Sequence, residues 1–252
     1  MNSSTKKIII ILLCLLVFSC VKRQVVRQAV LEPYTGPVTV ETLRKSIVFR
    51  NVRTIKSSVD VKIFRDMKPA GDLSGIFVYK SPGHMRLSLF GPFGVTVLDF
   101  LLSKDLFQTY IPPKNIIYEW SSSDASFNAL LDDRFSYSMA ERGDDFVLYA
   151  YIPGNNSELI AEYSFDNTYL LNRSIIFYRR GREIARLYFD DFNGRNPGHI
   201  KLLFITGMSM EISLNQPEFD SDVPNSYFRP VDHANRTVLP LQDILSRFEP
   251  NP

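Results

Sequence analysis

The sequence predicts a mainly β protein built on a single antiparallel sheet, and two observations carry this prediction. From about residue 52 to residue 214 apolar and polar residues alternate, as in 59–63, 85–89 and 208–214, which is the pattern of half-buried strands. Turn-forming residues recur between these runs, so strands that follow one another in the chain should pair as hairpins. We expect the turns at 68–71, 81–83, 142–145, 153–156, 180–182 and 193–194.

Several of the predicted strands are apolar on both faces. The stretches 146–152, 184–189 and 200–205 contain few polar residues. A sheet with two apolar faces must be covered on both sides or must line a hydrophobic cavity. The chain has 19 Phe and 12 Tyr against one Trp, so aromatic side chains could fill such a face.

Three short segments are predicted to be helical. In 39–48, Val40, Leu43 and Ile47 share one helical face, and Thr39 with Thr42 forms part of a capping signal. In 124–132, Asp124 can cap a helix whose apolar face is Phe127, Leu130 and Leu131. The third helix, 241–248, follows a proline-rich stretch and is also amphipathic.

The first residues resemble a bacterial lipoprotein signal. Lys6 and Lys7 precede an apolar run, 8–18, which ends at Ser19-Cys20. The run is shorter than the roughly 20 residues that an α-helix needs to cross a bilayer. Val17-Phe18-Ser19-Cys20 is similar to the lipobox, in which the Cys thiol receives a diacylglycerol and the chain is cut before it. An ordinary signal peptide with an incidental Cys, or an uncleaved anchor helix, would be the alternatives.

We therefore expect three parts: a signal peptide, 1–19, a lipidated Cys20 with a tether, 20–38, and one domain, 39–252. Acylation with two or three chains gives stable anchoring. Val21 follows Cys20, and in this pathway a residue other than Asp implies export to the outer membrane of an organism that has one. Basic residues early in the tether would lie near anionic head groups. With Cys14 cleaved off and Cys20 acylated, no disulfide can form.

Composition and motifs give little support to enzyme chemistry. His84, His199 and His233 are widely spaced, without the pattern of a metal site. No Gly-x-Ser-x-Gly elbow occurs, and adjacent carboxylates such as Asp144-Asp145 suit solvated turns. The signal carries two of the 29 basic residues and none of the 27 acidic ones, so the mature chain is close to neutral. We expect no enzyme, no cofactor, no metal and no nucleic-acid partner.

Residues 80–120 carry a recognisable order of motifs. Lys80-Ser81-Pro82-Gly83-His84-Met85-Arg86-Leu87 begins a strand, and the turn Gly91-Pro92-Phe93-Gly94 follows. A strand ending in Tyr110 and a strand with Asn115 and Tyr118 come next. This order resembles the LolA/LolB-like lipoprotein-carrier superfamily. The resemblance implies an open, incomplete β-barrel of about 10–11 strands, with helices covering the concave side and an apolar cavity for acyl chains.

The LolB type is itself an outer-membrane lipoprotein, and it exposes an apolar residue in a Pro-Leu-Gly turn that helps to deliver lipoproteins into the membrane. Phe93 occupies the matching position here, with Phe in place of Leu. The alternative is that Phe93 packs on its own hairpin. For the cavity, alternation does not tell which face is concave. The candidate lining residues are Leu87, Leu89, Val97, Phe100, Leu148, Leu187 and Phe204.

The resulting functional prediction is a periplasm-facing lipoprotein of the outer membrane that binds acyl chains of lipids or lipoproteins. It would receive lipoproteins from a periplasmic carrier protein and pass them to the membrane. The alternative is a structural or assembly lipoprotein of the envelope that acts through a protein partner without ligand transfer. The basic turn Arg179-Arg180-Gly181-Arg182 fits either a solvated hairpin tip or contact with anionic lipid.

Overall fold

A computed structural model describes residues 30–103, 106–121, 135–154, 158–205 and 207–240. Residues 31–252 form one compact unit. The strands begin with β1 (Thr54–Arg65), β2 (Lys68–Lys80), β3 (His84–Phe90), β4 (Thr96–Ser103), β5 (Leu106–Ile111), β6 (Ile116–Ser121) and β7 (Ser136–Arg142). They continue with β8 (Asp145–Ile152), β9 (Glu158–Asp166), β10 (Asn172–Arg179), β11 (Arg182–Asn193), β12 (Asn196–Phe204), β13 (Met208–Phe219) and β14 (Thr237–Pro240).

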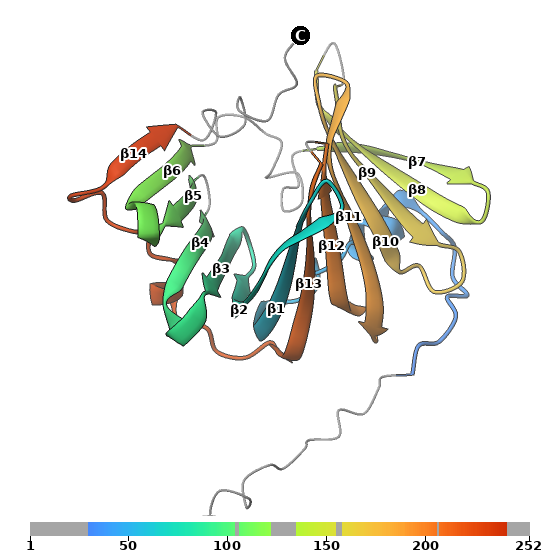
Figure 1. Cartoon of the computed structure of the whole chain (residues 1–252). Coiled ribbons are helices and arrows are strands. Elements are labelled where there is room, and N and C mark those ends of the chain that lie inside the picture. Colours follow the sequence, from blue (N-terminus) through green and yellow to red (C-terminus); the bar gives the residue numbers. More distant parts are fainter. Residues whose placement is uncertain (1–29, 104–105, 122–134, 155–157, 206, 241–252) are drawn as a thin grey trace, which may run out of the picture. The chain divides into compact units, whose positions relative to one another are not determined.

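These strands form one curved sheet with the order β14-β6-β5-β4-β3-β2-β1-β13-β12-β11-β10-β9-β8-β7 (Figure 1). Two meanders, β1–β6 and β7–β13, join where β1 pairs antiparallel with β13. The short β14 pairs parallel with β6. In the described part of the chain β14 and β7 end the sheet, so it is not closed into a barrel. The predicted open, antiparallel fold is therefore confirmed.

The structure extends the prediction in the number of strands and corrects one turn. The described residues hold 14 strands instead of 10–11, and the last of them, β14, comes from the proline-rich stretch. The first turn is Asp66-Met67, both with positive φ, and not 68–71, which begins β2. Pro69 and Gly71 are tolerated there because β3 pairs with β2 only from Ser74 onward, which leaves their outer edge free.

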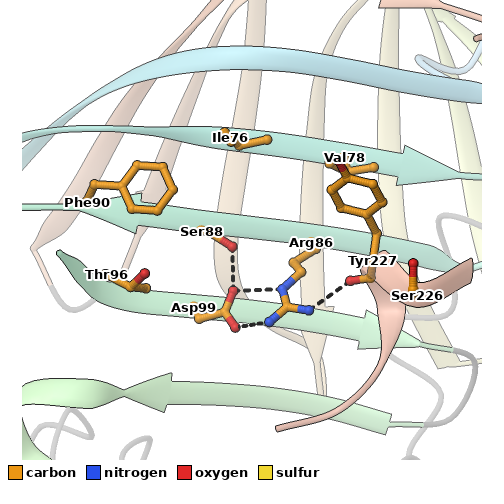
Figure 2. A pocket seen from close by; sticks show the side chains of 9 residues that line it. All are labelled: Ile76, Val78, Arg86, Ser88, Phe90, Thr96, Asp99, Ser226 and Tyr227. Carbon is orange, nitrogen blue, oxygen red and sulfur yellow. Dashed lines mark hydrogen bonds and ion pairs between the residues drawn. The ribbon is translucent and has the colours of Figure 1, made fainter. Parts of the chain in front are cut away.

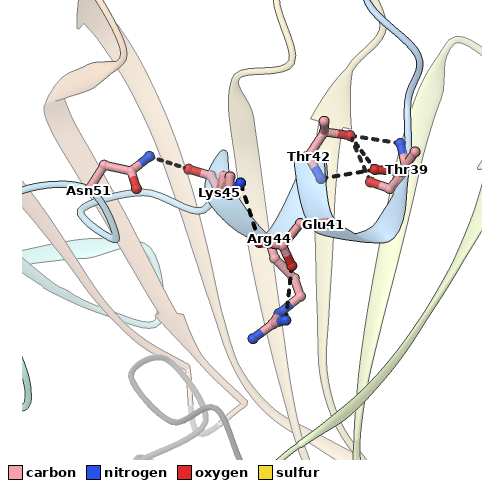
Figure 3. A network of polar contacts seen from close by, with 6 residues as sticks. All are labelled: Thr39, Glu41, Thr42, Arg44, Lys45 and Asn51. Atoms are coloured by element: carbon pink, nitrogen blue, oxygen red, sulfur yellow. Dashed lines mark hydrogen bonds and ion pairs between the residues drawn. The ribbon is translucent and has the colours of Figure 1, made fainter.

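The helix predicted at 39–48 is present as the shorter α2 (Val40–Lys45). Its N-terminus is closed by a capping box: the Thr42 amide donates to Thr39 Oγ1 at 3.2 Å, and the Thr39 amide donates to Thr42 Oγ1 at 2.7 Å (Figure 3). Asn51 Nδ2 donates to the Lys45 carbonyl at 2.6 Å and so caps the other end. These bonds fix α2 so that Leu43 is fully buried on the sheet.

The remaining described helical turns are the 3₁₀ segments η1 (Pro92–Gly94), η2 (Pro112–Lys114) and η4 (Asn225–Phe228). The helices predicted at 124–132 and 241–248 lie outside the described residues, so helices covering the concave side are not shown. Within the described residues, no helix has the length and apolar character that crossing a membrane requires.

Candidate functional site

One face of the sheet carries the apolar residues that the sequence singled out. Directly paired residues of neighbouring antiparallel strands point to the same face. Leu87 pairs with both Phe77 and Phe100, and Leu187 pairs with both Ile175 and Leu202. Extending this register across the sheet places all seven candidate lining residues on a single face, which we call the apolar face.

The apolar face holds two packed clusters. Cluster 1 lies on β8–β11 and cluster 2 on β1–β3 and β13. The buried residues of cluster 1 include Leu43, Ile47, Leu148, Tyr163, Phe165, Ile175, Phe177 and Phe189. Those of cluster 2 are Ile55, Val59, Val61, Phe77, Tyr79, Leu87, Leu89, Met210 and Leu214. Leu202 and Phe204 pack against both, so the two clusters form one continuous apolar surface.

Cluster 1 is closed by the chain itself. Leu43 and Ile47, from α2 and the turn after it, pack over Leu148 and Tyr163, and all four are buried. Burial is the main cause that raises the pKa of the Tyr163 phenol above its usual value, because an ionised ring oxygen would lose its hydration there. This part of the face is a buried core.

The rest of the apolar face is only half-buried. We call this region the apolar band, and it crosses the sheet from β4 to β11. Its residues are Val97, Phe100, Leu73, Ile63, Ile212, Leu202, Phe204 and Leu187. Pairs such as Leu202 with Met210 and Met210 with Ile63 connect its members across β12, β13 and β1, whereas β3 contributes the buried Leu87 and Leu89 beneath it. The band crosses six inter-strand spacings, about 29 Å at roughly 4.8 Å each.

The seven candidate lining residues therefore divide into two groups. Leu89 and Leu148 have no exposed surface and Leu87 has little, so these three belong to the core. Val97, Phe100, Leu187 and Phe204 belong to the apolar band, where their side chains keep contact with solvent. Their role in ligand binding stays a prediction.

A pocket of about 380 Å³ lies on the opposite face of β2–β4 (Figure 2). At its floor Arg86 and Asp99 form a two-pronged ion pair, with Arg86 Nε donating to Asp99 Oδ1 at 2.9 Å. Ser88 Oγ donates to the same oxygen at 2.6 Å. A third arm, Arg86 Nη1, donates to the Tyr227 carbonyl at 2.8 Å. Because these donors and acceptors satisfy one another, the network suits a structural role better than binding of a charged ligand.

The network holds a C-terminal strap, 221–240, against this face. Val223 and Phe228 of the strap are buried against Val78 and Leu101. Further along, the Gln108 side chain both donates to the Val231 carbonyl at 3.2 Å and accepts from the Val231 amide at 2.7 Å. The strap then forms β14. This arrangement is not predictable from the sequence, because Arg86 and Asp99 come from different strands and no local pattern links them to the strap.

Phe93 is placed in solvent at the tip of the β3–β4 hairpin. Its side chain is fully exposed, at 102%, and its φ is 63°. The neighbouring Val95 is also exposed. A left-handed backbone is unfavourable for a bulky residue, and an apolar side chain gains nothing from standing in water. The alternative that Phe93 packs on its own hairpin is not what the structure has.

The other polar candidates are dispersed. His84 contacts Ser103, His199 contacts Asp190, and His233 contacts Glu119. Among the described residues no three His, Cys, Asp or Glu side chains group in a way that could hold a metal ion. The predicted signal, 1–19, and the predicted lipidation site, Cys20, lie outside the described residues.

No family model and no curated protein matches the sequence. Solved structures of other proteins do match this chain, and they identify its fold. A domain assigned to outer membrane lipoprotein sorting, from Vibrio parahaemolyticus, is 14% identical with a TM-score of 0.58, covering 75% of this chain and 94% of that one. A LolA superfamily protein from Nitrosomonas europaea is 12% identical with a TM-score of 0.55, covering 77% and 99%. A DUF1329 family protein from Desulfovibrio piger is 14% identical with a TM-score of 0.56, covering 77% and 98%. The chain thus has the fold of the LolA/LolB-like superfamily, as its motifs between residues 80 and 120 indicate.

Proposed function

We propose that this protein is an outer-membrane lipoprotein, anchored through Cys20, whose apolar band binds acyl chains of lipids or of other lipoproteins. It acts by binding and not by catalysis. The observation that carries the proposal is the band itself: eight apolar side chains on six strands that the described chain leaves half-buried. Single exposed apolar residues are ordinary on a protein surface, whereas a contiguous apolar surface marks a binding site.

The expected affinity follows from the area that an acyl chain would remove from water. Each buried methylene contributes about 0.8 kcal/mol, so a chain of about 15 methylenes gains about 12 kcal/mol. Loss of translational and rotational freedom costs at least about 4 kcal/mol. At most about 8 kcal/mol remains, which corresponds to a Kd of about 1 μM or weaker, so the band can hold a chain and still release it into a bilayer.

Phe93 would serve the release step. In this proposal the β3–β4 tip touches the membrane surface, and the exposed Phe93 side chain enters the interface while cargo leaves the band. Burying a Phe side chain contributes about 1.5–3 kcal/mol. A periplasmic carrier protein would supply the cargo. The strain at Phe93 is consistent with a residue kept for contact with something outside the fold.

A second candidate function is supported by cluster 1. There the chain covers its own apolar face with α2, and a protein partner could cover the apolar band in the same way. The protein would then be an assembly lipoprotein of the envelope that transfers no ligand.

Native mass spectrometry of the purified full chain separates the two functions. Lipid bound in the apolar band adds mass that collisional activation removes, whereas acyl groups on Cys20 stay. We expect Leu187→Gln to reduce the lipid-bound fraction severalfold. Leu203→Gln is the matched control, because Leu203 is also half-buried but pairs with Arg186 on the opposite face. Absence of removable lipid from the wild-type protein, together with co-purification of a protein, would favour the second function.

A further inference from the structure

Three hairpin tips lie side by side at one end of the sheet. The Asp66 amide, in the β1–β2 tip, donates to the Gly207 carbonyl in the β12–β13 tip at 2.9 Å. The Ile205 amide, in that second tip, donates to the Ile184 carbonyl of β11 at 3.3 Å. Since β11 begins directly after the β10–β11 tip, the three tips form a row. Figure 1 shows the same neighbours in the order of β2, β1, β13, β12, β11 and β10.

Two of these tips end in exposed apolar side chains. Met67 is 93% exposed and has φ of 62°, and Ile205 is 69% exposed. Neither side chain covers any part of clusters 1 or 2. Met67 also adopts a left-handed backbone, a conformation that Gly or Asn takes at lower cost. Folding of the chain therefore gives no reason for Met at this position.

Basic residues surround the apolar tips. The third tip carries Arg179 and Arg182, directly opposite each other, on either side of Arg180-Gly181. Arg65 and Lys68 flank the first tip, and all five cationic side chains are exposed. The acidic residues at this end are Asp66 in the first tip, Glu183 next to Arg182, and Glu158, which accepts the backbone amide of Arg180 at 2.7 Å. The row of tips therefore presents a net positive charge.

From this arrangement we infer that the row of tips is a second membrane-contact surface, in which Met67 and Ile205 enter the interface of an anionic phospholipid bilayer and the arginines contact its phosphates. A protein partner would require a broad, complementary surface of about 800 Å², whereas separate apolar points ringed by cations suit a fluid surface of negative charge. The inference rests on the membrane attachment proposed above, but not on acyl-chain binding.

The attachment of the N-terminal segment makes this surface distinct from the anchor. Tyr34 donates its backbone amide to the Thr168 carbonyl at 2.7 Å, in the β9–β10 turn at the opposite end of the sheet. Asp144, in the β7–β8 turn, marks the same end, because Asp145 pairs with Asp166. An anchor acting alone would not direct the row of tips toward the bilayer. Membrane contact at the tips therefore requires the apolar and basic side chains of the tips themselves.

Depth-dependent quenching tests the inference in the full chain, reconstituted into vesicles that carry nitroxide-labelled lipid. A single fluorophore is attached at Met67→Cys or Ile205→Cys, with Asp144→Cys as the control at the opposite end and the wild-type chain as the control for labelling at Cys20. In vesicles with phosphatidylglycerol we expect shallow nitroxides to quench both tip labels at least about threefold more than the control label. Replacing Arg179 and Arg182 by Gln should lower the docked population about fivefold for each charge removed.

The remaining outcomes separate the two proposals. Protein that does not float with the vesicles contradicts the anchor proposed at Cys20. Protein that floats with tip labels no more quenched than the control contradicts the second membrane-contact surface alone. Tip labels that become shielded with rising protein concentration, in detergent without bilayers, would assign the tips to protein contact and overturn the inference. Equal quenching in pure phosphatidylcholine would remove the role of the arginines.

Discussion

The two faces of strands β3 and β4 differ in how far their side chains find partners within the chain. On one face Arg86, Ser88 and Asp99 bond to one another and to the carbonyl of Tyr227, and the strap covers them. On the other face Val97 and Phe100 pack against cluster 2 and still keep exposed surface. The first face holds the structure together, whereas the second leaves apolar area for something that the chain does not supply. Substitutions on the two faces should therefore have different consequences.

The largest expected effect on stability is at the ion pair under the strap. Asp99→Ala removes the partner of both Arg86 and Ser88, and Asp99 itself is 5% exposed. Breaking such a buried pair from one side costs about 3–4 kcal/mol of unfolding free energy, measurable by urea denaturation. Glu183→Ala is the control, because its pair with Arg186 is half-exposed and should cost less than about 1 kcal/mol. If Asp99→Ala lowered the unfolding free energy by no more than Glu183→Ala does, the Arg86–Asp99 pair would not be what holds the strap.

The next effect separates the closed part of the apolar face from the open band. Leu148→Ala should lower the unfolding free energy by about 3 kcal/mol, because the side chain is fully buried in cluster 1. Leu187→Ala, at a half-buried position, should lower it by only about 1 kcal/mol but should weaken acyl-chain binding. We expect Leu148→Ala to leave binding unchanged once the protein is folded. Urea denaturation and titration with a fluorescent fatty acid measure the two quantities, and a fall in affinity for Leu148→Ala alone would reverse the assignment.

These expectations depend on information that the sequence supplies only in part. Alternation marked Leu87, Phe100, Leu148 and Leu187 as apolar positions within their own strands, whereas it is the pairing register that puts them on one face. Alternation could not tell that Leu148 is covered while Leu187 is not. Leu148 is covered because α2 packs over β7 and β8, a contact between segments about 100 residues apart.

The strap and the pairing of β1 with β13 were not predictable for the same reason. Local signals located hairpins, yet 221–240 contains prolines that favour a loop, and its position depends on Arg86, Gln108 and Val78 in distant strands. The predicted first turn at 68–71 is wrong, because Pro69 and Gly71 lie within β2 although both residue types favour turns. Asp66 and Met67 form the turn, although Met is a poor residue for positive φ. The exposure of Phe93 also required the structure.

A smaller effect tests whether cluster 1 is dry. Burial raises the pKa of Tyr163 in the folded state above its ordinary value of 10.0. Above pH 10 the unfolded chain ionises this phenol while the folded chain keeps its proton, so stability is full below that pH and falls as pH rises further. Well above pH 10 the unfolding free energy should fall by about 1.4 kcal/mol per pH unit. In Tyr163→Phe this part of the decline should disappear from urea denaturation curves measured between pH 9 and about 11, and an unchanged curve would indicate that water reaches cluster 1.

The smallest effect on stability is expected at Phe93. Phe93→Gly relieves a φ of 63° and removes no buried contact, so it should stabilise the protein by up to about 1 kcal/mol. Delivery of lipoproteins to the membrane should fall in the same variant, and fall further in Phe93→Glu, whereas Phe93→Leu should keep it. Thermal unfolding measures the change in stability, and fractionation of cell membranes measures the delivery of lipoproteins. Loss of stability in Phe93→Gly would mean that the side chain packs within the fold.

The central claim, that the apolar band holds acyl chains, is tested most directly by a fatty acid with a photoreactive group near its methyl end. After irradiation of the full chain, peptide mapping should find crosslinks at Phe100, Leu187, Leu202 and Phe204, and Leu187→Gln should reduce them while Leu203→Gln does not. Crosslinks confined to the pocket around Arg86, or no saturable crosslinking at all, would contradict the account.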